Sequence, residues 1–332
     1  MRIGRRSFVF SGLAGTLAAL SFRAMADDAK SVAVMFDSLE SPFWVTGLEV
    51  LKTKLKDAGY TPVESISNFD DNKQFEQLQS MIQKKVDGVI IVPTDSKACI
   101  PAIRAANAAK TPIVFFNRPP ADNDGAYTAI QADNRAIMKA TVTALVDKAR
   151  KIGGKYKAAI LIGDLGDQNA VQRRDGFFDV VDANKDIIDV VARIPTEWNA
   201  DKAFARLTDA LHANPDINFL VTSSDFLIPQ IEQALKIAGK WKKSGTEGHV
   251  LFAGFDGDEG GYQALADSYM DVEGVQNLYF EADLAIDSIK KMGAGETLPK
   301  LQLDPGFVLS QDKLMQDRQK SWGYAVWKKK HA

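Results

Sequence analysis

The sequence is poor in the two residue types that most often bind transition metals. Cys99 is its only cysteine, so no disulfide can form within the chain. The three histidines, His212, His249 and His331, lack the spacing of a zinc site. We therefore predict no bound metal, and we expect Cys99 to be a small, buried apolar residue within a helix.

The chain also lacks a strong charge of either sign. Its 41 lysines and arginines and its 43 aspartates and glutamates give a formal net charge of −2. Proteins that bind nucleic acid neutralise its phosphates with a basic surface, so this balance argues against a nucleic-acid partner. After residue 26, no apolar run approaches the length of about 20 residues that crosses a bilayer. We expect the mature protein to be soluble.

Sequence motifs of three enzyme classes are absent. The loop expected after the first strand, residues 37–44, contains no glycine and cannot carry the Gly-x-Gly-x-x-Gly motif of dinucleotide-binding enzymes. The segment Gly163–Gly166 lacks the lysine of a phosphate-binding Walker loop. No Gly-x-Ser-x-Gly nucleophile elbow occurs either. The sequence therefore predicts a protein that has no cofactor and is not an enzyme.

The first 26 residues predict an export signal. Arg2, Arg5 and Arg6 form a basic start, and the apolar stretch Phe8–Leu20 is too short to cross a bilayer. The adjacent pair of arginines is typical of a twin-arginine signal. The small-x-small pattern Ala24–Ala26 predicts cleavage after Ala26. We therefore expect the mature protein in the periplasm.

From Ser31 onward, short apolar runs alternate with longer segments of helical periodicity. The runs are rich in valine and isoleucine at both odd and even positions, as parallel strands covered on both faces must be. Such alternation predicts doubly wound parallel sheets. More than ten strands over roughly 300 residues predict two such sheets, one in each of two lobes. The clearest strand candidates are Val32–Phe36, Gly88–Val92, Pro112–Phe116, Ala158–Ile162, Ile187–Ile194, Ile217–Thr222 and His249–Phe255.

Polar and aromatic side chains follow these apolar runs. In open parallel sheets, ligands bind beyond the carboxyl ends of the strands, where the loops converge. The loops combine aromatic rings with amides, hydroxyls, carboxylates and arginines, which suits a polyol: rings cover its C–H faces and charged groups bind its hydroxyls. The relevant segments are 37–44, 93–96, 117–118, 167–177, 197–199, 223–225, 256–257 and 276–277.

Five short motifs in this order resemble the periplasmic sugar-binding proteins of the ribose and galactose type, which are class I solute-binding proteins of ABC importers. The resemblance covers essentially the whole mature chain. The motifs are Ser41-Pro42-Phe43-Trp44, Val92-Pro93-Thr94-Asp95, Phe115-Phe116-Asn117-Arg118, Arg173-x-x-Gly176-Phe177 and Gly254-Phe255-Asp256-Gly257.

This resemblance implies which residues contact the ligand. Phe43 or Trp44 would stack on one face of a sugar ring and Trp198 on the other, while Asp256 would accept hydrogen bonds from its hydroxyls. No counterpart of the calcium loop of galactose binders is found, and the identity of the sugar or sugar alcohol stays open. The full set is Ser41, Phe43, Trp44, Asn117, Arg118, Asn169, Arg173, Trp198, Ser224, Asp256 and Gln276.

The resemblance also implies the organisation and partners of the protein. Two α/β lobes would be joined by a hinge of three segments, with an N-terminal lobe formed by residues 27–133 and 277–304. The C-terminal lobe would comprise residues 134–276 and 305–332. The closed, ligand-bound monomer would be read by the permease of an ABC importer in the inner membrane. The alternative is a receptor that presents its ligand to a chemoreceptor or sensor kinase.

Several of these residues have structural alternatives that the sequence leaves open. Trp44 could belong to the core, and Asp225 or Asp256 could cap a helix. For Arg174 we favour a solvated helix face. Trp322 is expected to pack a C-terminal segment against one lobe.

Overall fold

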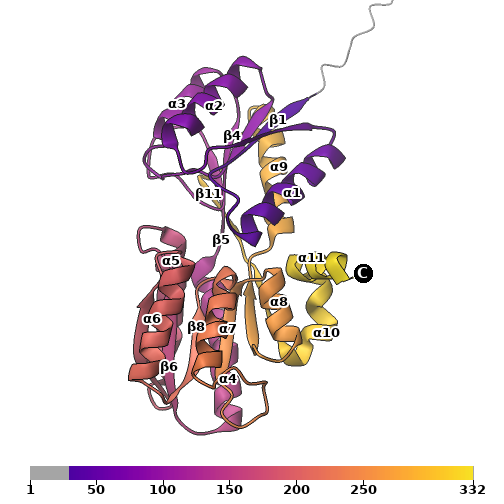
Figure 1. Cartoon of the computed structure of the whole chain (residues 1–332). Helices are drawn as coiled ribbons and strands as arrows, with labels where there is room; N and C mark the ends of the chain where they lie inside the picture. The colour runs from indigo at the N-terminus through magenta and orange to yellow at the C-terminus, as the bar shows by residue number, and fades with distance from the viewer. Residues whose placement is uncertain (1–29, 332) are drawn as a thin grey trace, which may run out of the picture.

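The chain folds into two α/β lobes that lie one above the other, with a narrow waist between them (Figure 1). The computed structural model describes residues 30–331. The expected export signal at residues 1–26 lies outside the described residues. In this part of the chain, twelve strands form two six-stranded sheets, which confirms the predicted class of two doubly wound lobes.

The first lobe is built on a sheet with the strand order β11-β5-β4-β3-β1-β2, and all of its strand pairs are parallel. Helices α1 and α9 pack on one face, and α2 and α3 pack on the other. The strands are β1 (Ser31–Phe36), β2 (Thr61–Ile66), β3 (Gly88–Ile91), β4 (Ile113–Phe116), β5 (Thr128–Ala132) and β11 (Leu301–Asp304). The helices are α1 (Pro42–Asp57), α2 (Asp71–Gln83), α3 (Ile100–Ala108) and α9 (Leu278–Gly293).

The second lobe has the strand order β12-β10-β9-β8-β6-β7. Its edge strand β12 runs antiparallel to β10, a departure from the all-parallel expectation. The strands are β6 (Tyr156–Ile162), β7 (Ile188–Pro195), β8 (Ile217–Thr222), β9 (Leu251–Asp256), β10 (Val272–Val275) and β12 (Phe307–Ser310). The helices are α4 (Asn134–Ile152), α5 (Gln168–Val181), α6 (Ala200–Ala213), α7 (Ile228–Ile237), α8 (Glu259–Ala266), α10 (Leu314–Asp317) and α11 (Trp322–His331).

Burial on both faces explains the composition of the strands. In β3, β4 and β9 every residue is buried, because helices cover each sheet on both sides. Helices α4 and α5 cover one face of the second sheet, and their close approach requires Gly176. A Cβ at Gly176 would lie 2.6 Å from the backbone oxygen of Arg135 on α4. The glycine of the motif that begins at Arg173 therefore permits helix packing.

Side-chain caps explain why polar residues follow the strands. Seven helices begin with a Ser, Asp or Asn whose side chain accepts a hydrogen bond from a backbone N–H of the first turn. These caps place short polar side chains at the carboxyl ends of the strands. The capping residues are Ser41, Asp70, Asp133, Asp167, Asn199, Asp258 and Asn277.

Two local expectations need correction. Cys99 is buried as expected, but it lies one residue before α3, because Asp95 accepts hydrogen bonds from the backbone of Lys97 and Ala98 and forms a turn there. Asp225 does not cap a helix. Its buried carboxylate instead accepts hydrogen bonds from backbone N–H groups of β9 and the loop that follows it.

The chain passes between the two sheets three times. The crossings lie between β5 and α4, between β10 and α9, and between β11 and β12. The C-terminal segment returns to the second lobe, where α11 packs against α8. There Trp322 is fully buried and donates a hydrogen bond to the backbone oxygens of Asp256 and Gln276. The predicted packing of this segment is thus confirmed, and it lies directly behind the second crossing.

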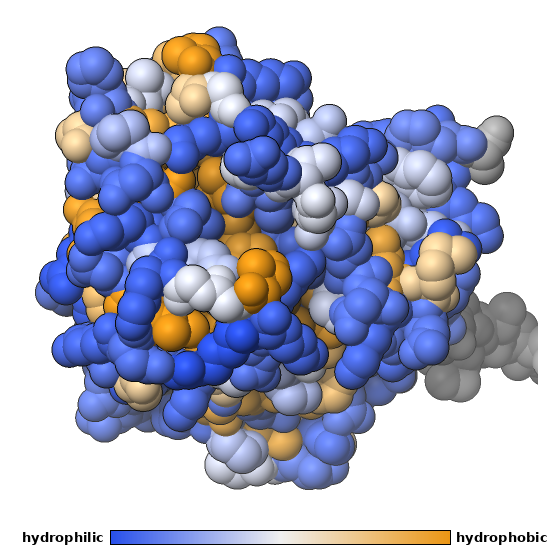
Figure 2. All heavy atoms as spheres, turned by 90° about the horizontal axis from the view of Figure 1, so that it is seen from below, coloured by the Kyte–Doolittle hydropathy of each residue, from blue (hydrophilic) through white to orange (hydrophobic). Residues whose placement is uncertain are grey.

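The end of the molecule below the second lobe in Figure 1 is mainly hydrophilic, and its apolar side chains are scattered in small groups (Figure 2). Within residues 30–331, no helix is both long enough and apolar enough to span a membrane.

Candidate functional site

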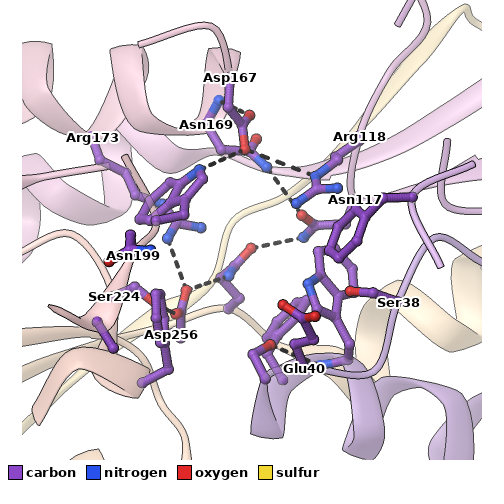
Figure 3. Close-up of a pocket in the computed structure, with 18 residues that line it drawn as sticks. Ser38, Glu40, Asn117, Arg118, Asp167, Asn169, Arg173, Asn199, Ser224 and Asp256 are labelled. Atoms are coloured by element: carbon purple, nitrogen blue, oxygen red, sulfur yellow. Dashed lines mark hydrogen bonds and ion pairs between the residues drawn. The ribbon is translucent and has the colours of Figure 1, made fainter. Parts of the chain in front are cut away.

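A pocket of about 390 Å³ lies between the lobes. Its lining comes from both lobes and from the second crossing (Figure 3). The structure brings every one of the eleven predicted site residues to this pocket: Ser41, Phe43, Trp44, Asn117, Arg118, Asn169, Arg173, Trp198, Ser224, Asp256 and Gln276. Its volume is within the range of about 300–1,000 Å³ typical of small-molecule sites.

Seven further residues line the pocket that were not among the predicted contacts. Four of them lie in the polar segments that follow strands, where the signal was present but no single residue could be chosen. Phe69 and Phe226 carried no signal, because an isolated phenylalanine in a loop or short helix looks like a core residue. The seven are Ser38, Glu40, Phe69, Asp167, Asn199, Ala200 and Phe226.

Trp44 and Arg118 form the aromatic and cationic wall of the first lobe. The guanidinium of Arg118 lies 4.9 Å from the centre of the Trp44 ring. Arg118 also pairs with Asp37, which is fully buried at the end of β1, and lies 3.8 Å from the Asp167 carboxylate of the second lobe. Burial raises the pKa of Asp37, and the charge of Arg118 opposes that rise.

Phe43 supports Trp44 from behind. Its ring is 6% exposed, packs edge-to-face on Trp44 at 4.9 Å and meets Trp322 at 5.9 Å. Trp44 is only half-buried and its indole borders the open pocket. Of the two candidates for the first aromatic face, Trp44 therefore offers the larger free surface.

Arg173 and Asp256 form a buried ion pair in the wall of the second lobe. Nη1 of Arg173 lies 2.9 Å from Oδ1 of Asp256, and both residues are about 5% exposed. The guanidinium of Arg173 also stacks on Phe255 and lies 4.1 Å from the centre of its ring. Burial raises the pKa of Asp256, while Arg173, Ser224 and Gln276 favour its ionised form. The alternative role of Asp256 as a helix cap is wrong, because Asp258 caps α8.

Asn117 and Gln276 connect the two walls. Nδ2 of Asn117 donates to Oε1 of Gln276 at 2.9 Å, and Nε2 of Gln276 donates to Oδ1 of Asp256 at 2.7 Å. Asn169 of the second lobe donates to Oδ1 of Asn117 at 3.1 Å. This chain of amides runs across the floor of the pocket (Figure 3). It links a residue of each lobe to the second crossing.

Trp198 stands opposite the first-lobe wall. Its indole N–H donates to Asp167 at 3.2 Å, and the centre of its ring lies 5.8 Å from the guanidinium of Arg173. Gly163 makes room for the ring, because a Cβ there would lie 2.2 Å from the indole. The predicted loop position of Trp198 is confirmed, since it lies in the turn before α6.

Strained backbone is concentrated at this pocket. Phe69, Asn117, Trp198 and Asp256 all line it, and their φ angles are 61°, 64°, 52° and 117°. Side-chain-bearing residues avoid such angles, and they persist where the surrounding structure imposes them. These backbone angles indicate a functional site, and this indication is independent of which side chains line the pocket.

A cluster of buried carboxyl groups lies behind Asp256. Oδ2 of Asp225 accepts hydrogen bonds from the backbone of Gly257 and Asp258, and Oε1 of Glu273 accepts one from Gly257. Burial raises the pKa of Asp225 and of Glu273 well above their usual values. The cluster holds the loop that carries Asp256. Across residues 30–331, no group of three or more His, Cys, Asp or Glu side chains is arranged to hold a metal ion.

The raised pKa values of this cluster predict that the folded state gains stability as the pH falls. Burial raises the pKa of Asp258 to about 7 from a usual value of 3.8. The folded state therefore binds this proton more tightly than the unfolded chain does. The stabilisation of the folded state by Asp258 is complete below about pH 4 and is lost as the pH rises through about 7. Asp258→Asn keeps the helix cap and removes the charge. We expect it to reduce the fall in the unfolding temperature between pH 4 and 8. An unchanged pH profile would contradict this role.

Comparison with known proteins places the fold and the pocket in context. Residues 32–297 match the family model described as periplasmic binding protein domain. The chain is 27% identical to the D-apiose import binding protein of Actinobacillus succinogenes over 74% of this chain and 77% of that protein. It is 28% identical to the ribose import binding protein of Salmonella typhimurium, over 75% and 79%.

Among solved structures, a periplasmic solute-binding protein of an ABC transporter from Actinobacillus succinogenes, with bound D-allose, superimposes with a TM-score of 0.78. The sequence identity is 23%, and the match covers 86% of this chain and 99% of that one.

Proposed function

Because the chain belongs to the family of periplasmic binding proteins, we propose that it captures a monosaccharide or sugar alcohol between its lobes and delivers it to an ABC importer. The members of this family bind solutes, so the chain is a binding protein and not an enzyme. Its relatives above are import binding proteins for D-apiose and for ribose, and a neighbouring structure contains D-allose.

One observation carries the choice of a polyhydroxylated ligand. The pocket presents the indoles of Trp44 and Trp198 from opposite lobes, and between them lie carboxylate, amide and guanidinium groups. Indole faces suit the C–H patches of a sugar ring, and charged groups form strong hydrogen bonds with hydroxyls. Both cations in the lining already have carboxylate partners, Arg118 with Asp37 and Arg173 with Asp256. Such a site favours a neutral ligand over an anion.

Capture requires the two lobes to close on the ligand. We propose that residues 27–133 and 277–304 move as one lobe and that residues 134–276 and 305–332 move as the other. The three crossings would then form the hinge. A ligand that contacts Arg118 and Asp256 together binds the closed form more tightly than the open form, and this difference shifts the population. The permease would then recognise the closed form of the monomer.

Export through the N-terminal signal completes the proposal. Cleavage after Ala26 would leave a mature chain that begins at Asp27. N-terminal sequencing of the protein recovered from the periplasm tests this cleavage site, and a start at any other residue would contradict it.

A thermal-shift screen of residues 27–332 tests the proposed ligand class. Pentoses, hexoses, sugar alcohols and, as a contrast, amino acids are each added at millimolar concentration. A ligand that binds only the folded state stabilises it by RT ln(1 + [L]/Kd), so micromolar binders give a clear rise in unfolding temperature. We expect a rise with one sugar or sugar alcohol. A response confined to amino acids, or none at all, would reject the proposal.

Removing the indole of Trp198 is expected to weaken binding of that ligand. Trp198→Ala loses a stacking contribution of about 0.5–1.5 kcal/mol beyond the buried area, which is roughly a two- to tenfold increase in Kd. The matched control is Trp241→Ala, because Trp241 lies in the same lobe but stacks on Tyr269 at 4.7 Å and does not line the pocket. Calorimetry should show a normal Kd for the control. Equal Kd values for the two variants would remove Trp198 from the site.

A further inference from the structure

Glu281 lies in the first turn of α9, and its carboxyl group accepts no hydrogen bond. Its side chain is fully buried, and neither carboxyl oxygen has a hydrogen-bond partner among the described residues. An ionised carboxylate in such a place would cost several kcal/mol in lost hydration. Burial raises the pKa of Glu281 well above its usual value, and the nearby charge of Asp304 raises it further.

The neighbour of Glu281 is a second buried carboxyl group. Asp304 is 1% exposed, but its oxygens are well supplied with donors. Oδ2 accepts from the backbone N–H of Asn277 at 2.6 Å, and Oδ1 accepts from that of Gly306 at 2.9 Å. Two adjacent buried carboxyl groups cannot both be ionised at low cost. Asp304 has the donors that an anion needs, so the proton belongs on Glu281.

We propose that Glu281 is a positioning residue of the cleft, which remains a neutral acid in the folded protein and donates its proton to Asp304. This hydrogen bond adds to the one between the backbone of Asn277, the cap of α9, and Asp304, and so joins the helix to the third crossing. The inference deepens the proposed function, since it concerns the residues that hold the ligand-binding amides in place.

The pair lies where the three crossings meet. Asp304 ends β11 immediately before the third crossing, and its backbone oxygen accepts a hydrogen bond from the backbone of Asp133 in the first crossing. Its carboxylate binds Asn277 in the second crossing. Glu281 follows Asn277 by one helical turn. Asp304 therefore contacts all three hinge segments at one point, and Glu281 acts on them through Asp304.

The same carboxyl group acts on the pocket through Asn117. The side-chain amide of Asn117 favours the ionised form of Glu281 and lowers its pKa, which opposes the effect of burial. The amide of Asn117 is held in turn by Gln276 and Asn169, on the floor of the pocket. Loss of the proton would place a second negative charge between Asn117 and Asp304. We expect Asn117 to shift when that happens.

The direction of the pH effect follows from the groups around Glu281. Asp304 and Asp256 raise its pKa and Arg173 lowers it, while Lys54 on α1 is paired with Asp283 instead. Since the folded-state pKa lies above the unfolded value, the stability from this group is complete at low pH. It is lost as the pH rises through the folded-state value. Ionisation of Glu281 as the pH rises should therefore loosen the hinge.

Infrared difference spectroscopy on the ligand-free mature protein tests the protonation. At pH 7 we expect the carbonyl stretch of a neutral carboxylic acid in the wild type, and we expect Glu281→Gln to reduce it by the signal of one group. The control is Glu76→Gln, which changes an exposed glutamate of α2 and should leave the signal unchanged. In Asp304→Asn, where the neighbouring charge is removed, the signal of Glu281 should disappear at a lower pH than in the wild type. Identical spectra for the wild type and Glu281→Gln would overturn the proposal.

A second readout separates positioning from mere stability. With ¹⁵N-labelled asparagine, the side-chain amide signal of Asn117 should move with pH in the wild type, at the same midpoint as the infrared signal. It should not move in Glu281→Gln, because glutamine is a permanent neutral donor and acceptor. If the Asn117 signal of the wild type did not change with pH, the positioning role of Glu281 would be rejected. Neither readout uses a ligand, so a failed sugar screen would refute the proposed function without affecting this test.

Discussion

Arg173→Ala is expected to lower ligand affinity by about 2–5 kcal/mol, which is roughly a 30- to 5,000-fold increase in Kd, whereas Arg174→Ala leaves Kd unchanged. Arg173 is 4% exposed and donates to Asp256, to Asn134 and to the backbone oxygen of Ser223. Removing it leaves the Asp256 carboxylate buried without its cationic partner. The ligand also loses the guanidinium that lines the pocket, and closing the lobes over the unpaired carboxylate costs more than it does in the wild type.

Arg174 is a control that the chain itself provides. It is the next residue of α5, yet its side chain is about one-third exposed and pairs with Asp175 instead of lining the pocket. The two variants remove the same charge from adjacent positions, so a general electrostatic effect would change both. Calorimetry with the ligand identified by the screen distinguishes them. Similar Kd values for the two variants would exclude Arg173 from the site.

Asp225→Ala is expected to lower the free energy of unfolding by about 2–4 kcal/mol. The substitution leaves the buried N–H groups of Phe255 and Asp258 without an acceptor, at about 1–3 kcal/mol each, while Gly257 keeps its hydrogen bond to Glu273. Relief of the repulsion between Asp225 and Glu273 offsets part of the cost. Urea denaturation measures the difference.

Two further variants test the cause of that loss. Asp225→Asn keeps one acceptor oxygen and adds a donor beside Glu273, so we expect it to lose less stability than Asp225→Ala. Asp209→Ala on α6 removes an exposed aspartate and should change the free energy of unfolding little. If Asp225→Ala were as stable as Asp209→Ala, the carboxyl cluster would not support the loop that carries Asp256.

The sequence predicted the sheets because burial on both faces leaves a clear pattern. The central strands β3 and β4 are apolar at every position, and β9 is apolar up to Asp256 at its end. The antiparallel direction of β12 was not predictable. An edge strand of four residues carries no signal for direction, which depends on how the third crossing re-enters the second sheet.

The eleven predicted site residues, which all line the pocket, were chosen partly from their position after strands and partly from the family resemblance. The sequence could not show which other residues hold these side chains in place. The contact of Trp322 with Asp256 and Gln276 joins residues 46 and more positions apart in the chain. The isolation of Glu281 is equally hidden, because glutamate in the first turn of a helix is normally exposed and favoured there by the helix dipole.

The order in which the strands pair has a consequence for biosynthesis. The first lobe is completed by α9 and β11, which lie beyond the whole central part of the second lobe in the chain. The second lobe is completed by β12 and by the segment that carries Trp322, both of which follow β11 in the chain. Domains usually fold as units from the N-terminus during synthesis. Here neither unit is whole until β11 and β12 have been made, so neither lobe can complete its sheet before most of the other lobe has been synthesised.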